Sequence, residues 1–162
     1  MSHVTDRAVS VTVSYTLTLM IATLLIGGLI TASGGLIERQ TEHATYEELD
    51  VVGQTLAANL LSADRLATVG HQDAAAVDGV EAADVDVELR TALPDRVAGT
   101  SYTIEVNVSD DGQGELVLRA HSPDVTATVP FVVSNMDGYT ETVRGGTVEI
   151  YTDEGELRVR QA

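Results

Sequence analysis

The feature that most constrains this chain is an uncharged, apolar run from Val9 to Ile37. It holds 29 residues without Asp, Glu, Lys, Arg or His, and thirteen of them are Val, Leu or Ile. As an α-helix the run would be about 43 Å long, at about 1.5 Å per residue. Because roughly 20 apolar residues span a bilayer, the run predicts a membrane-spanning helix over residues 9–37.

Three interpretations of this segment compete. A cleaved secretory signal has an apolar core of about 7–15 residues before a small-x-small site. Thr31-Ala32-Ser33 fits such a site, but the apolar core before it is too long. An uncleaved signal anchor needs only hydrophobic length and flanking charge. The third interpretation rests on the junction that precedes the run.

At that junction two charged residues, Asp6 and Arg7, are followed by Ala8 and then by the apolar run, which begins at Val9. This pattern resembles the class III signal peptide of archaeal type IV pilins. The resemblance implies that a prepilin peptidase removes residues 1–8 by cutting after Ala8, and that the mature chain begins at Val9. Bacterial pilins usually carry a Glu at the fifth mature position, and this Glu pairs with the terminal amine of a neighbouring subunit. This chain has Val13 there, so the resemblance does not imply that pairing.

Small residues recur in the second half of the apolar run, at Gly27, Gly28, Gly34 and Gly35. Small side chains let helices approach closely, which favours helix packing in a membrane or a filament core. The alternative is that the helix merely tolerates these glycines and is more flexible because of them. We expect them to be packing positions.

The composition is strongly acidic. The formal net charge is −16, and all nine basic residues are Arg because the chain has no Lys. Such a surface keeps proteins apart and hydrated at high salt, which is typical of halophiles. We therefore expect a salt-loving archaeal source. The scattered arginines do not form the basic cluster that nucleic-acid binding requires, so we expect no nucleic-acid partner.

Flanking charges predict the orientation. Arg7 precedes the apolar run, whereas Glu38, Glu42, Glu47 and Glu48 follow it. By the positive-inside rule the N-terminus is cytoplasmic and the chain beyond Ile37 lies outside the cell. The absence of Cys is compatible with that location.

Residues 38–68 predict an amphipathic extension of the membrane helix. Apolar residues recur there at spacings of three and four, at Leu49, Val52, Leu56, Leu60, Ala63 and Ala67. Gly34-Gly35 and Gly53 each weaken a helix by about 1 kcal/mol relative to Ala and permit bends.

Residues 69–162 predict an extracellular antiparallel β domain. We expect a loop from Val69 to Ala83. Beyond it apolar and polar residues alternate, which is typical of β-strands. Turn sequences predict two hairpins, and Pro130 is expected on an edge or at a bulge. The expected strands are 85–89, 102–108, 116–120, 125–133, 148–151 and 157–160. The predicted class is α+β: a long helix packed on one antiparallel sheet of about five or six strands.

Catalytic and metal motifs are absent from the sequence. His3, His43, His71 and His121 have no metal-ligand spacing. Asp84-x-Asp86-x-Glu88 resembles the start of a calcium loop, but the sixth and twelfth positions are Leu89 and Asp95 rather than Gly and Glu. No catalytic serine, zinc or phosphate-loop motif occurs. We expect neither an enzyme nor a cofactor.

Asn107-Val108-Ser109 is the one N-glycosylation sequon. Asn107 falls at a predicted strand end beside a turn, on the outside of the membrane. We therefore expect it to be a candidate for modification.

Taken together, these features predict a type IV pilin-like surface subunit, minor or accessory, assembled through its apolar helix. The implied partners are membrane lipid, other pilin-like subunits, prepilin peptidase and the pilus assembly machinery. The alternative is an extracellular binding module of a haloarchaeon that stays anchored by an uncleaved signal.

Overall fold

The computed structural model describes residues 3–76 and 86–162, and within these ranges it describes side chains at 13–32 and from residue 38 onward. Helix α1 runs from His3 to Ala75, and seven strands follow in the described part of the chain. Two compact units are present, one ending at Gln40 and the other beginning at Thr41. The predicted α+β class is confirmed.

Helix α1 extends past its expected end at Thr68. The prediction of a loop from Val69 was wrong as far as Ala75, and residues 77–85 lie outside the described part. The buried line of the helix continues to Ala74, which is almost fully buried. Burial of Ala74 against the core thus accompanies the extra helical turns, and Ala is the strongest helix former.

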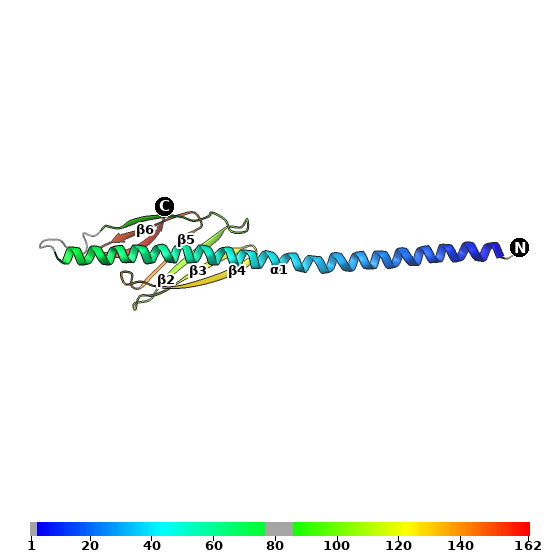
Figure 1. Cartoon of the computed structure of the whole chain (residues 1–162), viewed down its shortest axis with the longest axis horizontal. Helices are drawn as coiled ribbons and strands as arrows, with labels where there is room; N and C mark the ends of the chain where they lie inside the picture. Colours follow the sequence, from blue (N-terminus) through cyan, green and yellow to red (C-terminus); the bar gives the residue numbers. More distant parts are fainter. Residues whose placement is uncertain (1–2, 77–85) are drawn as a thin grey trace. The chain divides into compact units, whose positions relative to one another are not determined.

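The strands form two antiparallel sheets. One has the order β1-β6-β7 and the other the order β4-β3-β2-β5. In Figure 1 they lie beside the cyan and green part of α1. The expectation of a single sheet was wrong. The strands are β1 (Glu88–Ala92), β2 (Tyr102–Val108), β3 (Gln113–His121), β4 (Asp124–Val132), β5 (Tyr139–Arg144), β6 (Thr147–Asp153) and β7 (Glu156–Gln161).

Both predicted hairpins are confirmed. Strands β2 and β3 pair from Tyr102–Ala120 to Val108–Gly114, and the turn between them includes Gly112 at φ +75°. Strands β6 and β7 pair around a second turn. Strand β4 is an edge strand with Pro130 exposed, as the proline predicts.

Strand β5 was not expected, because its only buried apolar residues are Tyr139 and Val143. After β5 the chain turns at Gly145-Gly146 and enters the other sheet as β6. A Cβ on Gly145 would lie 2.6 Å from the Tyr102 ring and 2.9 Å from the Pro94 carbonyl oxygen, so this corner has no room for a side chain.

The first strand begins later than expected. The period-two pattern predicted a strand over residues 85–89, but β1 starts at Glu88 and ends at Ala92. Val85 lies outside the described residues. Val87 precedes the strand, and its N–H donates to the Thr152 hydroxyl.

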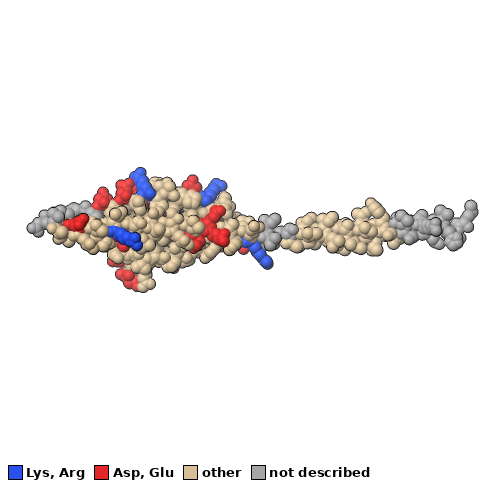
Figure 2. Space-filling view, in the orientation of Figure 1, with Lys and Arg blue, Asp and Glu red and all other residues tan. Residues whose placement is uncertain are grey.

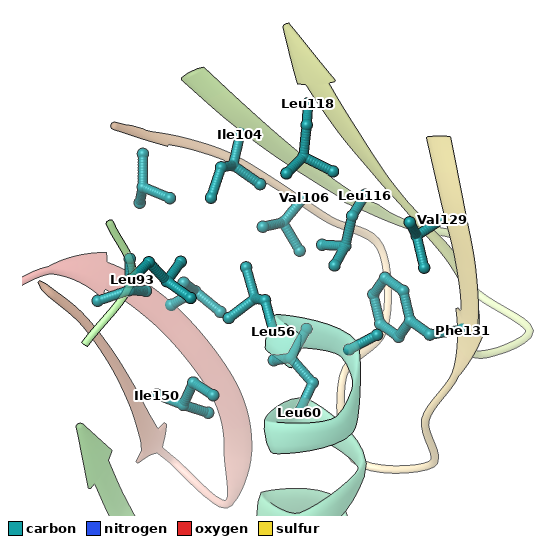
Figure 3. Close-up of a cluster of buried hydrophobic side chains, with 14 of the residues drawn as sticks. Leu56, Leu60, Leu93, Ile104, Val106, Leu116, Leu118, Val129, Phe131 and Ile150 are labelled. Atoms are coloured by element: carbon teal, nitrogen blue, oxygen red, sulfur yellow. The ribbon is translucent and has the colours of Figure 1, made fainter. Parts of the chain in front are cut away.

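One hydrophobic core joins α1 to both sheets. Figure 3 shows Leu56 and Leu60 of α1 among side chains from the four-stranded sheet, such as Leu116, and from the three-stranded sheet, such as Ile150. These four side chains are fully buried. Burial of one such side chain stabilises the fold by about 1.5–3 kcal/mol. The predicted apolar line from Leu49 to Ala67 is confirmed as the buried face of the helix.

Gly53 is the point of closest approach between α1 and the four-stranded sheet. A Cβ at this position would lie 2.7 Å from Val129 Cγ2 and 2.8 Å from Leu118 Cδ1. The helix continues through Gly53 without interruption. Its role is therefore close packing against the sheet.

We expect Gly53→Val to lower the free energy of unfolding by about 2–3 kcal/mol, because the added methyl groups overlap Val129 and Leu118. Ala58→Val is the matched control on the exposed side of the same helix, and its effect should stay near 0.5 kcal/mol. Thermal unfolding of the full chain in detergent at high salt, followed by circular dichroism, measures both. Equal effects would contradict close packing at Gly53.

Candidate functional site

The first candidate site is the apolar segment Val13–Ala32 of α1. Its mean hydropathy is 2.0 over 20 residues, so by length and composition it is able to cross a membrane. The large side chains are exposed on every side of the helix, including Tyr15, Leu24 and Ile30, each about two-thirds exposed. A helix that is apolar all round requires an apolar environment.

Three threonine hydroxyls in this segment are bonded within the helix. Thr18, Thr23 and Thr31 each donate to the carbonyl oxygen four residues earlier, at 2.8–2.9 Å. Such bonds remove the polar hydrogen from the helix surface. The segment therefore presents mainly carbon to its surroundings, and transfer of these threonines out of water leaves no unpaired donor.

Gly27 and Gly28 lie on the open surface of this segment. A Cβ added at either position would meet no atom within 4 Å. Space for a side chain is therefore open at both glycines among the described residues, and another helix could approach there. Gly34 and Gly35, and the junction residues Asp6, Arg7, Ala8 and Val9, lie on the backbone of α1, outside the described side chains.

A partly buried polar cluster around the buried Asp64 joins α1 to the segment between β4 and β5. Asp64 Oδ1 accepts the backbone N–H groups of Ser134 and Asn135, each at 2.9 Å, and the Asn135 side-chain amide at 2.9 Å. That amide also donates to the Thr68 hydroxyl at 2.9 Å. In turn, the Asn135 carbonyl accepts the Leu157 N–H of β7. One carboxylate thus fixes the helix against both sheets.

Sequence reasoning did not identify this cluster, although a signal was present. Asp64 is the only acidic residue between Asp50 and Asp73. It directly follows the buried residue Ala63 on the apolar line of the helix. A single acidic residue beside a buried line has to find hydrogen-bond donors there.

Glu149 forms the centre of an ion-pair network on the three-stranded sheet. It is almost fully buried, and strand pairing places Arg90 of β1 and Arg160 of β7 on either side of it. Arg90 Nη2 lies 3.2 Å from Glu149 Oε1, and Arg160 Nε donates to Glu149 Oε2. The Arg160 guanidinium also lies 4.2 Å from the centre of the Tyr151 ring. Hydrogen bonds, that from Arg160 first, lower the pKa of Glu149 from 4.5 to about 2.

The histidines of the described side chains do not come together. His43 pairs with Glu47 at 3.2 Å on the surface of α1, and His121 is exposed at the end of β3. The Nε2 atom of His71 is buried, without a hydrogen-bond partner among the described residues. Within that same part of the chain no group of His, Asp and Glu is arranged to hold a metal ion.

The calcium-like pattern lies partly outside the described residues, because Asp84 is not among them. Its last member, Glu88, pairs with Arg90.

Asn107 lies next to the last residue of β2, beside the turn to β3, as the sequence predicts. Strand β2 pairs there with both β3 and β5, and Asn107 is opposite Glu115 and Thr140. Its side-chain amide donates to Glu105 at 3.2 Å. A polar depression of about 510 Å³ surrounds it, lined by Glu115, Thr140 and Pro130 among others.

A second depression, mainly apolar and about 420 Å³ in volume, lies where α1 meets the connection between β1 and β2. Val51 and Val52 of the helix line one wall, and Pro94 and Val97 line the other.

The model of a family of unknown function (DUF7266) matches residues 4–162, so the chain belongs to that family. No curated protein and no solved structure matches the chain.

We expect Asp64→Ala to lower the free energy of unfolding by about 2 kcal/mol, since it removes the acceptor of three partly buried N–H donors of Ser134 and Asn135. Asp64→Asn retains one side-chain oxygen and should lose less. Arg65→Ala, at the exposed neighbouring position, should change stability by less than about 0.5 kcal/mol. Denaturant titration of the full chain measures all three. A neutral Asp64→Ala would exclude the proposed role of the cluster.

The Glu149 network predicts a pH dependence. Because the folded-state pKa is lowered from 4.5 to about 2, folding favours the ionised carboxylate. The resulting stabilisation is present above about pH 4.5 and is lost as the pH falls towards 2. The melting temperature of wild type should therefore exceed that of Glu149→Gln at pH 6, and the difference should shrink over this window. A difference that stays constant from pH 6 to pH 2 would refute the assignment.

Proposed function

We propose that this member of the DUF7266 family is a type IV pilin-like cell-surface subunit, minor or accessory, that assembles through its N-terminal apolar helix. The observation that carries the proposal is the segment Val13–Ala32, which is exposed all round and whose Thr18, Thr23 and Thr31 hydroxyls are bonded within the helix. Such a surface suits lipid and also suits the neighbouring helices that replace lipid in a filament core.

The mechanism is physical. Insertion of the apolar helix into the membrane holds the newly made subunit, and a prepilin peptidase removes residues 1–8. The assembly machinery then transfers the helix from lipid into a bundle of similar helices. In that bundle Gly27 and Gly28, where an added Cβ would meet no other described residue, allow close approach by a neighbour.

We further propose that the N-terminus faces the cytoplasm and that the β domain lies outside the cell. The single Arg before the apolar run and the acidic residues after it support this orientation. The net charge of −16 without any Lys supports a haloarchaeal source. The partners are lipid, other pilin-like subunits and the assembly machinery, and the role is structural rather than catalytic.

One observation favours a second candidate function, an anchored binding module. The polar depression around Asn107 combines amide, carboxylate and hydroxyl groups on an exposed sheet face. Such a surface suits an extracellular polar ligand. The two functions differ at the N-terminus, since only the pilin-like subunit requires removal of the leader.

The proposal predicts that the native protein begins at Val9. Ala8→Trp should leave the leader attached, because the peptidase requires a small residue before the bond that it cuts. Mass spectrometry of the N-terminal peptide from membranes measures the result, with Ser2→Trp as a control inside the leader that should still be processed. Native protein that retains Ser2 through Ala8 would favour the uncleaved anchor.

A further inference from the structure

Between residues 51 and 72 the side of α1 opposite the core carries almost no charge. The charged residues of this stretch are Asp64, which is buried, and Arg65, which is exposed. The exposed apolar side chains on this stretch are Val51, Leu66 and Val69, each more than half exposed. In Figure 2 acidic side chains appear over other parts of the head, and the area between them is largely uncharged.

Two hydroxyl groups on this stretch are bonded to the backbone of the helix. Thr55 donates to the Val51 carbonyl and Ser62 donates to the Ala58 carbonyl, each at 2.8 Å. Together with Ala58, these residues give the middle of the exposed face a small and mainly carbon surface. Large apolar residues lie at either end of it.

We propose that this outer face, from Val51 to Asp73, receives the same helix of a second copy of the chain, parallel to it and shifted by eight residues. The proposal rests on the pilin-like function, which orients all copies alike in one membrane, and it adds the head-domain contact between neighbours. Because the shift repeats from copy to copy, the contact is open-ended and builds a filament rather than a closed dimer.

Charge identifies a second copy as the occupant. Two chains of net charge −16 repel each other over most of their surfaces, and this face is where they approach without opposing carboxylates. Its one exposed cation, Arg65, has an exposed carboxylate eight residues further along the helix, at Asp73. Among the described residues neither forms an ion pair.

The shift follows from matching these groups. Arg65 and Asp73 are about 12 Å apart along one helix at about 1.5 Å per residue, too far to pair within a chain. An eight-residue shift places Arg65 of one copy beside the acidic position of the next. The same shift places the small Ala58 opposite the large Leu66, and puts two small residues, Ser62 and Gly70, opposite each other. A small residue opposite a large or a small one permits close helix packing.

Energy transfer between full-length chains in detergent micelles tests the interface, because a bilayer would hold all copies at one depth and oppose a shift of about 12 Å along the helix. The chain has no Cys, so Thr126→Cys on the exposed face of β4 gives one dye site. Donor-labelled and acceptor-labelled chains are mixed in a nonionic detergent at high salt, and the protein-to-detergent ratio at half-maximal transfer is measured. Ala58→Glu should raise that ratio at least about tenfold, because the new carboxylate would be buried against Leu66. Thr142→Glu on β5 adds the same charge elsewhere and should leave the ratio unchanged.

Charge reversal tests the register. Arg65→Asp and Asp73→Arg should each raise the half-maximal ratio about threefold, the range of one exposed ion pair. The double variant should return to the wild-type ratio. Asp73→Arg is decisive, since it lowers the net negative charge, and general repulsion alone would make it associate better than wild type.

The outcomes are separable from those of the pilin-like proposal. An unchanged ratio for Ala58→Glu would overturn the interface, and so would the absence of transfer in wild type. A double variant that stays as weak as the single variants would overturn the eight-residue register. If transfer depends on Ala58 but the native leader is never removed, the helix contact stands and the pilin-like function falls.

Discussion

The fold of the head depends on one constraint: a single face of α1 has to fill the space between two sheets. Leu56 and Leu60 are fully buried among side chains of both sheets, and Gly53 allows the four-stranded sheet to lie against the helix backbone. The Asp64 carboxylate then fixes the helix to the β4–β5 connection and, through Asn135, to β7. Because this face is fully used, the rest of the helix surface is left for other partners.

The two parts of α1 show what the same backbone does with different side chains. From Leu49 onward one line of apolar residues is covered by the sheets, and only single apolar side chains such as Val51, Leu66 and Val69 stay exposed on the described part of the helix. In Val13–Ala32 they surround the helix, and the described residues of the chain cover none of them. A covered line stabilises a domain, whereas an uncovered apolar cylinder needs lipid or other helices. The proposed function follows from that difference, and the proposed contact between heads uses the remaining uncharged side of the helix.

Sequence patterns predicted the helix face, both hairpins and the edge position of Pro130, because each depends on local periodicity or turn chemistry. The split into two sheets was not predicted, since it depends on the corner at Gly145-Gly146 and on β5, which has only two buried apolar residues. The Asp64 cluster and the Glu149 network were also missed, because their partners lie far away in the sequence. The pilin-like resemblance rests on the junction at Asp6 to Val9, and the fold by itself does not test it.

The central claim is that the apolar helix leaves the membrane and enters a filament. The most direct measurement is the amount of the protein in sheared surface filaments relative to membranes, for wild type and Gly28→Leu, in cells that are making pili. The account predicts wild-type protein in the filament fraction, and a reduced share for Gly28→Leu with unchanged membrane insertion, because the larger side chain blocks close helix approach. Wild-type protein that stays entirely in the membrane fraction would contradict the account and leave the anchored module as the better explanation.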